Sequence, residues 1–174
     1  MHETPADLER LQQLLDESDT RGGAHLRAVI TDERRLSAAD LTEQLTGMKL
    51  LTLATTSSTG APIAAPVDGI FYRSEFWFGS ALNSLRFQHI RQRSQVSATH
   101  LPDEHLGITI HGEAHIEGAP DTLPQGFRDL CVEIYGDGWD EWGEGSLYAR
   151  IQPRRMFTFS LDPAEAERLT AEMT

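Results

Sequence analysis

Six short segments with the pattern of β-strands recur between Leu50 and Leu161, and turn residues separate several of them. "SSTGAP" lies between the first two segments, and only Arg73 and Ser74 lie between the second and third. Strands joined this closely are antiparallel neighbours. Sheets of such strands tend to close into a small barrel, because closure removes exposed edges. The pattern predicts a mainly β (α+β) fold, a six-stranded antiparallel barrel with strands at 50–56, 63–72, 75–80, 95–101, 106–118 and 146–161.

Helical patterns flank and interrupt these strands. Leucines at helical spacing predict a helix over residues 5–18, and Ser37 can cap a second helix with Asp40 in the capping-box position. Further helices are expected at 83–94, at 121–135 and at the acidic C-terminus. "AHLRAVI" has the pattern of a short strand or a turn, and "GDGWDEWGEG" that of a loop. The chain therefore divides into an N-terminal helical extension (1–35), a barrel domain (36–161) and a C-terminal helix (162–174).

Charge and cysteine content restrict the partners and the compartment. The formal net charge of -12 argues against binding to nucleic acids or anionic membranes, because phosphate groups need a positive surface. The chain has no apolar run of about 18 residues, and its N-terminus lacks the basic-then-apolar pattern of a signal peptide. The single cysteine, Cys131, has apolar neighbours, which favours a small buried side chain in a reducing compartment. We therefore expect a cytoplasmic protein.

Two histidines in "GITIHGEAHIEG" suggest a metal site at first sight. The zinc motif of metalloprotease helices is His-Glu-x-x-His, whereas this segment has His111, Glu113 and His115 at alternate positions. On a strand these side chains share one side, with the two histidines about 13 Å apart at ~3.3 Å per residue. That separation is too large for two ligands of one zinc ion, whose Zn–N bonds measure about 2 Å. We therefore predict a barrel strand here and no metal site.

The stretch "SALNSLRF" has the features of a phosphate-binding helix start. Asn83 or Ser84 can cap the helix, and Arg86 can then point at an anion that the free N–H groups of the first turn also attract. The alternative is that Arg86, Arg91 and Arg93 form a solvated helix face, with the last two paired to acidic residues. The residues alone leave both interpretations open.

A flat ring would need an apolar wall, and two segments can supply one. "IAAPV" at 63–67 has small side chains that allow close backbone approach, and Pro66 belongs at a sheet edge or bulge because it donates no ladder hydrogen bond. Trp139 and Trp142 lie in a glycine-containing segment, where they either cover a ring system or dimer interface, or anchor the segment on the core.

Three stretches, in this order, carry a resemblance to a known family. They are "LLTLATTSSTGAPIAAPVDGIFY", "FWFGSALNSLRFQHIRQRSQVSAT" and "GITIHGEAHI". The first resembles an opening pair of strands with a Gly turn and an "xPV" segment, and the second a strand, loop and helix with a Ser-x-basic step. From about Leu36 to Leu161 the chain resembles the pyridoxamine 5'-phosphate oxidase-like family, the flavin-binding split barrels.

The resemblance implies a six-stranded split barrel with flanking helices, and a homodimer that holds FMN at the subunit interface. It places Ser80, Ser84 and Arg86 at the cofactor phosphate. It places the backbone of Ala65, Pro66 and Val67 against the flavin ring. We also predict that Trp142 contacts the cofactor. It implies an oxidoreductase that passes electrons or hydride through the flavin to a small-molecule substrate.

No catalytic side chain is predicted, because the flavin itself reacts. The paired Arg and His that bind substrate in the true oxidase have no counterpart, so pyridoxamine phosphate is not the expected substrate. The alternatives are a split barrel that binds a deazaflavin or haem, and a flavin-binding module without enzymatic activity. If the protein is a homodimer, the leucine stripe of the N-terminal extension is a candidate for enlarging the interface, since it must be buried somewhere.

Overall fold

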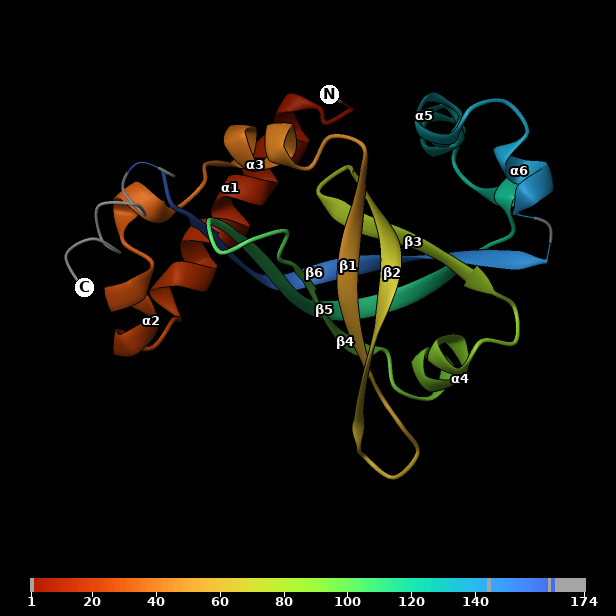
Figure 1. Cartoon of the computed structure of the whole chain (residues 1–174), viewed down its shortest axis with the longest axis horizontal. Helices are drawn as coiled ribbons and strands as arrows, with labels where there is room; N and C mark the ends of the chain where they lie inside the picture. The colour runs from red at the N-terminus through yellow and green to blue at the C-terminus, as the bar shows by residue number, and fades with distance from the viewer. Residues whose placement is uncertain (1, 144, 163, 165–174) are drawn as a thin grey trace.

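The computed structural model describes residues 2–143, 145–162 and 164, with the backbone alone at Trp142. Six antiparallel strands close into a barrel in the order β1-β2-β3-β6-β5-β4 (Figure 1). This arrangement confirms the predicted barrel, and every strand overlaps its predicted segment. The strands are β1 (Met48–Thr56), β2 (Pro62–Tyr72), β3 (Glu75–Ala81), β4 (Gln95–His100), β5 (Leu106–Gly118) and β6 (Ser146–Ser160).

Alternation along the strands separates two clusters of apolar side chains. On β3, Phe76 and Phe78 are fully buried in the cluster that fills the barrel. Trp77 between them belongs to a second cluster, outside the barrel. The helix α4 (Leu85–Gln92) contributes Phe87 to the inner cluster, where it stacks on Phe78 with ring centroids 6.1 Å apart. The strand period of two thus gives the barrel a filled interior and one covered outer face.

The helix α1 (Pro5–Thr20) packs against β6, and its leucine stripe meets the barrel core. Leu11 and Leu15 are buried in the same cluster as the inward side chains of the strands. Ser18 also accepts a hydrogen bond of 3.0 Å from the backbone N–H of Met156 on β6. The stripe is therefore buried within one chain, and its burial needs no second copy.

The connection from α1 to β1 is helical. The segment expected as a strand or turn forms the short helix α2 (Ala24–Val29), so that expectation is wrong, and the 3₁₀ turn η1 (Asp32–Arg34) follows it. The next helix, α3 (Ala38–Gln44), starts as predicted, because the Ser37 hydroxyl accepts the N–H of Asp40 at 3.2 Å. The Ser37 cap allowed the start of α3 to be predicted from the sequence. The six-residue α2 has no side-chain cap that could have indicated its start.

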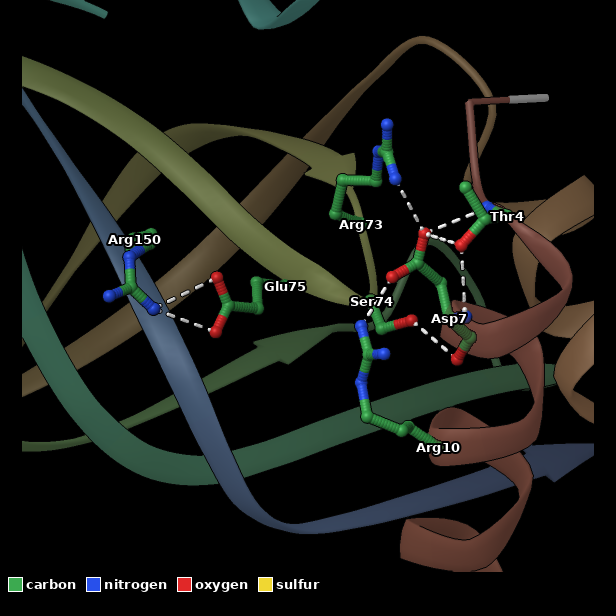
Figure 2. Close-up of polar contacts among 7 residues, drawn as sticks. All are labelled: Thr4, Asp7, Arg10, Arg73, Ser74, Glu75 and Arg150. Carbon is green, nitrogen blue, oxygen red and sulfur yellow. Dashed lines mark hydrogen bonds and ion pairs between the residues drawn. The ribbon is translucent and has the colours of Figure 1, made fainter. Parts of the chain in front are cut away.

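The two-residue turn between β2 and β3 is held by the start of α1. Arg73 and Ser74 both have positive φ, 55° and 67°, as the tight turn of a twisted hairpin requires. Asp7 braces this turn: its carboxylate accepts Arg73 Nη1 at 3.0 Å, and its carbonyl accepts the Ser74 hydroxyl at 3.0 Å. Figure 2 shows Arg73 and Arg10 reaching the Asp7 carboxylate from opposite sides, with the Thr4 cap beside them. The N-terminal helix is thus tied to the sheet by polar contacts as well as by leucines.

The segment between β5 and β6 covers the outer face formed by β2, β3 and β6. It contains the turn η2 (Pro120–Thr122), the helix α5 (Gln125–Tyr135) and the short helix α6 (Trp139–Trp142), which lies where a loop was expected. Phe127 of α5 stacks on Trp77 with ring centroids 4.4 Å apart, and Cys131 is fully buried, as predicted. Trp139 is buried against Tyr148, so it anchors this segment on the core.

The C-terminal helix predicted at 162–174 falls mostly outside the described residues. Within the described part of the chain, no helix has the length and apolar character needed to cross a membrane.

Candidate functional site

A cavity of about 280 Å³ lies beside β2, where β3, α4, β6 and the end of α5 approach one another. We call it the β2-edge cavity. Carbon atoms of Val67, Ile70 and Phe78 form part of its wall. Its polar side chains are Asp68, Ser80, Arg86, Tyr135, Ser146 and Tyr148.

The cavity exists because β2 has a free edge. β2 pairs with β1 from Pro62 to Ile70, but it pairs with β3 only from Gly69 to Tyr72. The stretch before Gly69 therefore has no strand on its β3 side, and Pro66 lies in this stretch, as its missing N–H predicts. Arg86 of α4 approaches this edge, and its Nη2 donates to the Pro66 carbonyl at 2.9 Å.

Arg86 is a half-buried cation with an uncommon set of partners. Its Nη1 donates to the Ser80 hydroxyl at 3.4 Å, and within the described chain no carboxylate forms an ion pair with it. Burial lowers the pKa of Arg86, because desolvation disfavours the charged form. A guanidinium has five N–H donors, and the described contacts use two of them. The remaining donors and the uncompensated charge leave this part of the cavity wall positively charged and able to donate further hydrogen bonds.

The start of α4 lies next to this cation. Ser84 is its N-cap, and the Ser84 hydroxyl accepts the N–H of Phe87 at 3.4 Å. This resolves the choice between Asn83 and Ser84 as the capping residue. The first intrahelical bond runs from Gln88 to Ser84, so the N–H groups of Leu85 and Arg86 are not used inside the helix. A helix start and Arg86 thus occur in one place, as the sequence pattern indicated.

The other arginines near α4 bind backbone instead of acids. Arg91 donates to the Leu82 carbonyl at 3.3 Å, and Arg93 donates to the Ser58 carbonyl at 3.2 Å. No ion pair of either residue with an acidic side chain is present in the described part of the chain, so the expected pairing is wrong.

The residues predicted to contact a cofactor are only partly brought together. Val67, Ser80 and Arg86 line the β2-edge cavity, and Pro66 reaches it through the carbonyl bound by Arg86. Ala65 lies further along β2, and Ser84 lies at the helix start; neither lines the cavity. Trp142 ends α6, and its side chain lies outside what the structure describes.

Four polar cavity residues were not singled out in the sequence: Asp68, Tyr135, Ser146 and Tyr148. Burial, followed by the nearby negative charge of Asp68, raises the pKa of Tyr135 to about 12. Burial likewise raises the pKa of Tyr148, which is therefore a neutral phenol at neutral pH. A signal for Asp68 was present, because it is a charged residue within the otherwise apolar "APVDGIF". No sequence signal pointed to Tyr135, because it ends the helix α5, far along the chain from β2.

The histidines of β5 occupy an outer face of the barrel. His111 Nδ1 lies 2.7 Å from the Ser97 hydroxyl on β4, and Glu113 accepts Arg154 Nη2 at 2.7 Å. Along β5 these three residues alternate with the buried Gly112 and Ala114, which confirms the strand and their shared side. Among the described residues, no group of three histidine, cysteine or acidic side chains is arranged to hold a metal ion.

No protein-family model matches the sequence, and no curated protein matches it. Solved structures do match. The conserved hypothetical protein Rv2991 from Mycobacterium tuberculosis aligns with a TM-score of 0.62 at 19% identity, over 75% of this chain and 88% of that chain. The heme storage protein HutZ from Vibrio cholerae aligns with a TM-score of 0.59 at 16% identity, over 70% and 93%. A FAD-binding protein from Mesorhizobium loti aligns with a TM-score of 0.54 at 19% identity, over 72% and 93%. At these identities the matches establish the fold.

Proposed function

We propose that this chain, which has the split-barrel fold of the pyridoxamine 5'-phosphate oxidase-like proteins, binds FMN at the β2-edge cavity and acts as an oxidoreductase through it. The observation that carries the proposal is Arg86, a half-buried cation without a carboxylate partner in the described chain, at the wall of a cavity beside a helix start. A phosphate dianion supplies the charge that this position lacks.

The residues present fit such a ligand. Arg86, the Ser80 hydroxyl and the start of α4 would hold the phosphate, and the free edge of β2 around Pro66 would face the ring. The bound flavin would supply electron or hydride transfer, and the chain would orient it and keep water away. No side chain is required as an acid or base for that role.

The size of the cavity supports a homodimer. Ligand pockets usually span roughly 300–1,000 Å³, so about 280 Å³ encloses only part of a molecule as large as FMN. The ring would then lie along the β2 edge, where one chain leaves it open to solvent. β1 borders β2 on the side opposite this edge and exposes Met48 and Leu50, the latter paired with Asp68; Leu101 just beyond β4 is exposed too. The three side chains are 42%, 59% and 66% exposed. A second copy placed against these apolar side chains would cover both the patch and the ring.

A haem-binding split barrel is the second candidate, because the heme storage protein HutZ has this fold. A deazaflavin remains the third. All three ligands absorb visible light with distinct spectra, so the spectrum of the purified protein and the mass of its released ligand identify the cofactor. Turnover with a reduced nicotinamide separates an enzyme from a flavin-binding module.

Titration with FMN tests the proposal. We expect flavin fluorescence to be quenched on binding, and Arg86→Ala to weaken binding at least tenfold, since a charge-assisted hydrogen bond contributes about 1.5–3 kcal/mol. Arg91→Ala is the matched control, because Arg91 is an exposed arginine of the same helix. A wild-type protein that takes up no FMN would refute the proposed function. Equal affinity of the wild type and Arg86→Ala would refute the phosphate assignment.

A further inference from the structure

The β2-edge cavity has two ends of opposite character. Arg86 and Ser80 form the cationic end. Asp68 lies one residue beyond the cavity residue Val67, exposes its carboxylate, and forms neither a hydrogen bond nor an ion pair in the described chain. Its separation from the Arg86 guanidinium thus exceeds the 4.0 Å of an ion pair. A ligand that fills this cavity therefore meets a cation and a carboxylate at different points of its wall.

Tyr135 is next to the acidic end, and the fold fixes its position. It is the last residue of α5, and Gly136 with φ of 87° turns the chain away after it. The helix itself is held by Phe127, which stacks on Trp77 under the cavity wall. Asp68 and Tyr135 both line the cavity. Burial, together with the negative charge of Asp68, raises the pKa of Tyr135 to about 12, so this phenol is protonated at neutral pH. The pair offers a carboxylate acceptor and a hydroxyl that can donate or accept.

These groups select for one kind of ligand. A carboxylate accepts hydrogen bonds from hydroxyl groups and repels other anions. A ligand with an anion at one end and a hydroxyl-bearing chain next to it satisfies Arg86 and Asp68 together. Haem satisfies only one of the two groups, because its propionates can pair with Arg86 but it carries no hydroxyl to donate to Asp68. A flavin whose ring is linked to its phosphate through a polyol chain fits both ends.

We infer that Asp68 and Tyr135 bind the hydroxyl groups of the polyol chain that links a flavin ring to its phosphate, and so select phosphorylated flavins over haem. The inference rests on the proposed function and extends it from the phosphate to the adjoining part of the ligand. In this arrangement the Asp68 carboxylate accepts hydrogen bonds from one or two hydroxyls of the polyol chain. Tyr135 contacts the same chain from the α5 side.

The test compares FMN with lumiflavin, which has the ring without the polyol phosphate. Asp68→Ala and Tyr135→Phe should each weaken FMN binding about fivefold or more, and should leave lumiflavin binding unchanged. Asp68→Asn should not weaken haem binding, since it removes a repulsive charge. Both positions are partly exposed, so the variants are expected to fold, and their thermal unfolding checks this.

The outcomes separate this inference from the proposed function. If the wild type binds FMN and Arg86→Ala weakens it, while Asp68→Ala and Tyr135→Phe bind FMN as the wild type does, the inference alone is overturned. Tighter FMN binding by Asp68→Ala also overturns it, because the carboxylate would then only repel the phosphate. If the wild type binds no FMN, both the inference and the proposed function fall.

Discussion

Replacing Asp7 with asparagine should loosen α1 from the sheet. Asp7 is buried, and its carboxylate accepts bonds from the N–H of Thr4 at 2.7 Å and from Arg73 at 3.0 Å, as well as from Arg10 (Figure 2). Burial by itself would raise the pKa of Asp7, but the hydrogen bonds from Thr4, Arg73 and Arg10 outweigh it and lower the pKa from 3.8 to about 2. The charged form is therefore more stable in the folded protein than in the unfolded chain.

The size of the effect follows from this pKa. A lowering from 3.8 to about 2 corresponds to about 2.4 kcal/mol at 1.36 kcal/mol per pKa unit. Arg10 and Arg73 are 65% and 46% exposed, so solvent screens part of their contribution. We expect Asp7→Asn to lower the free energy of unfolding by about 1–2 kcal/mol at pH 7.

The lowered pKa also fixes how the stability difference between the wild type and Asp7→Asn changes with pH. Because the folded-state pKa is lowered, the contribution of Asp7 is fully present above the unfolded pKa of about 4 and is lost as the pH falls toward 2. The difference between the wild type and Asp7→Asn should thus be constant from pH 7 to pH 5 and shrink below pH 4.

Urea unfolding at several pH values measures this difference. Asp16→Asn is the control, since Asp16 lies on the same helix and is exposed. If Asp7→Asn were as stable as the wild type at pH 7, or if its deficit did not change with pH, the assigned role of the Asp7 carboxylate would be wrong.

Two further predictions concern the sheet. A Cβ on Gly112 would lie 2.1 Å from the backbone oxygen of Gln152, so Gly112→Ala should lower the free energy of unfolding in urea by about 1–3 kcal/mol. Gly23→Ala is the control and should be near neutral, because a Cβ there meets open space. Equal stability of the two variants would contradict this prediction. Leu50→Glu should weaken the proposed homodimer at least about tenfold in analytical ultracentrifugation, because the interface would bury an unpaired charge. A monomeric wild type would exclude that interface.

Much of the fold was readable locally. Strand alternation and turn residues predicted the six strands, and the Ser37 and Ser84 caps were found because a cap is a contact between residues three apart. The positive φ at Arg73 and Ser74 follows from a two-residue hairpin turn. The short helix α2 was missed, because six residues without a cap carry too little pattern to favour helix over turn.

The site depends on contacts between distant parts of the chain. The sequence identified Arg86 and its helix start, and it placed Pro66 at an edge. It did not reveal that the guanidinium meets the Pro66 carbonyl, because that contact arises where β2 loses its β3 partner and leaves a free edge for α4. Asp68 and Tyr135 line the same cavity only because α5 docks through Phe127 on Trp77. Interactions between residues close in the sequence determine the backbone conformation and the helix caps. Closure of the barrel and docking of the helices determine which side chains line the same cavity.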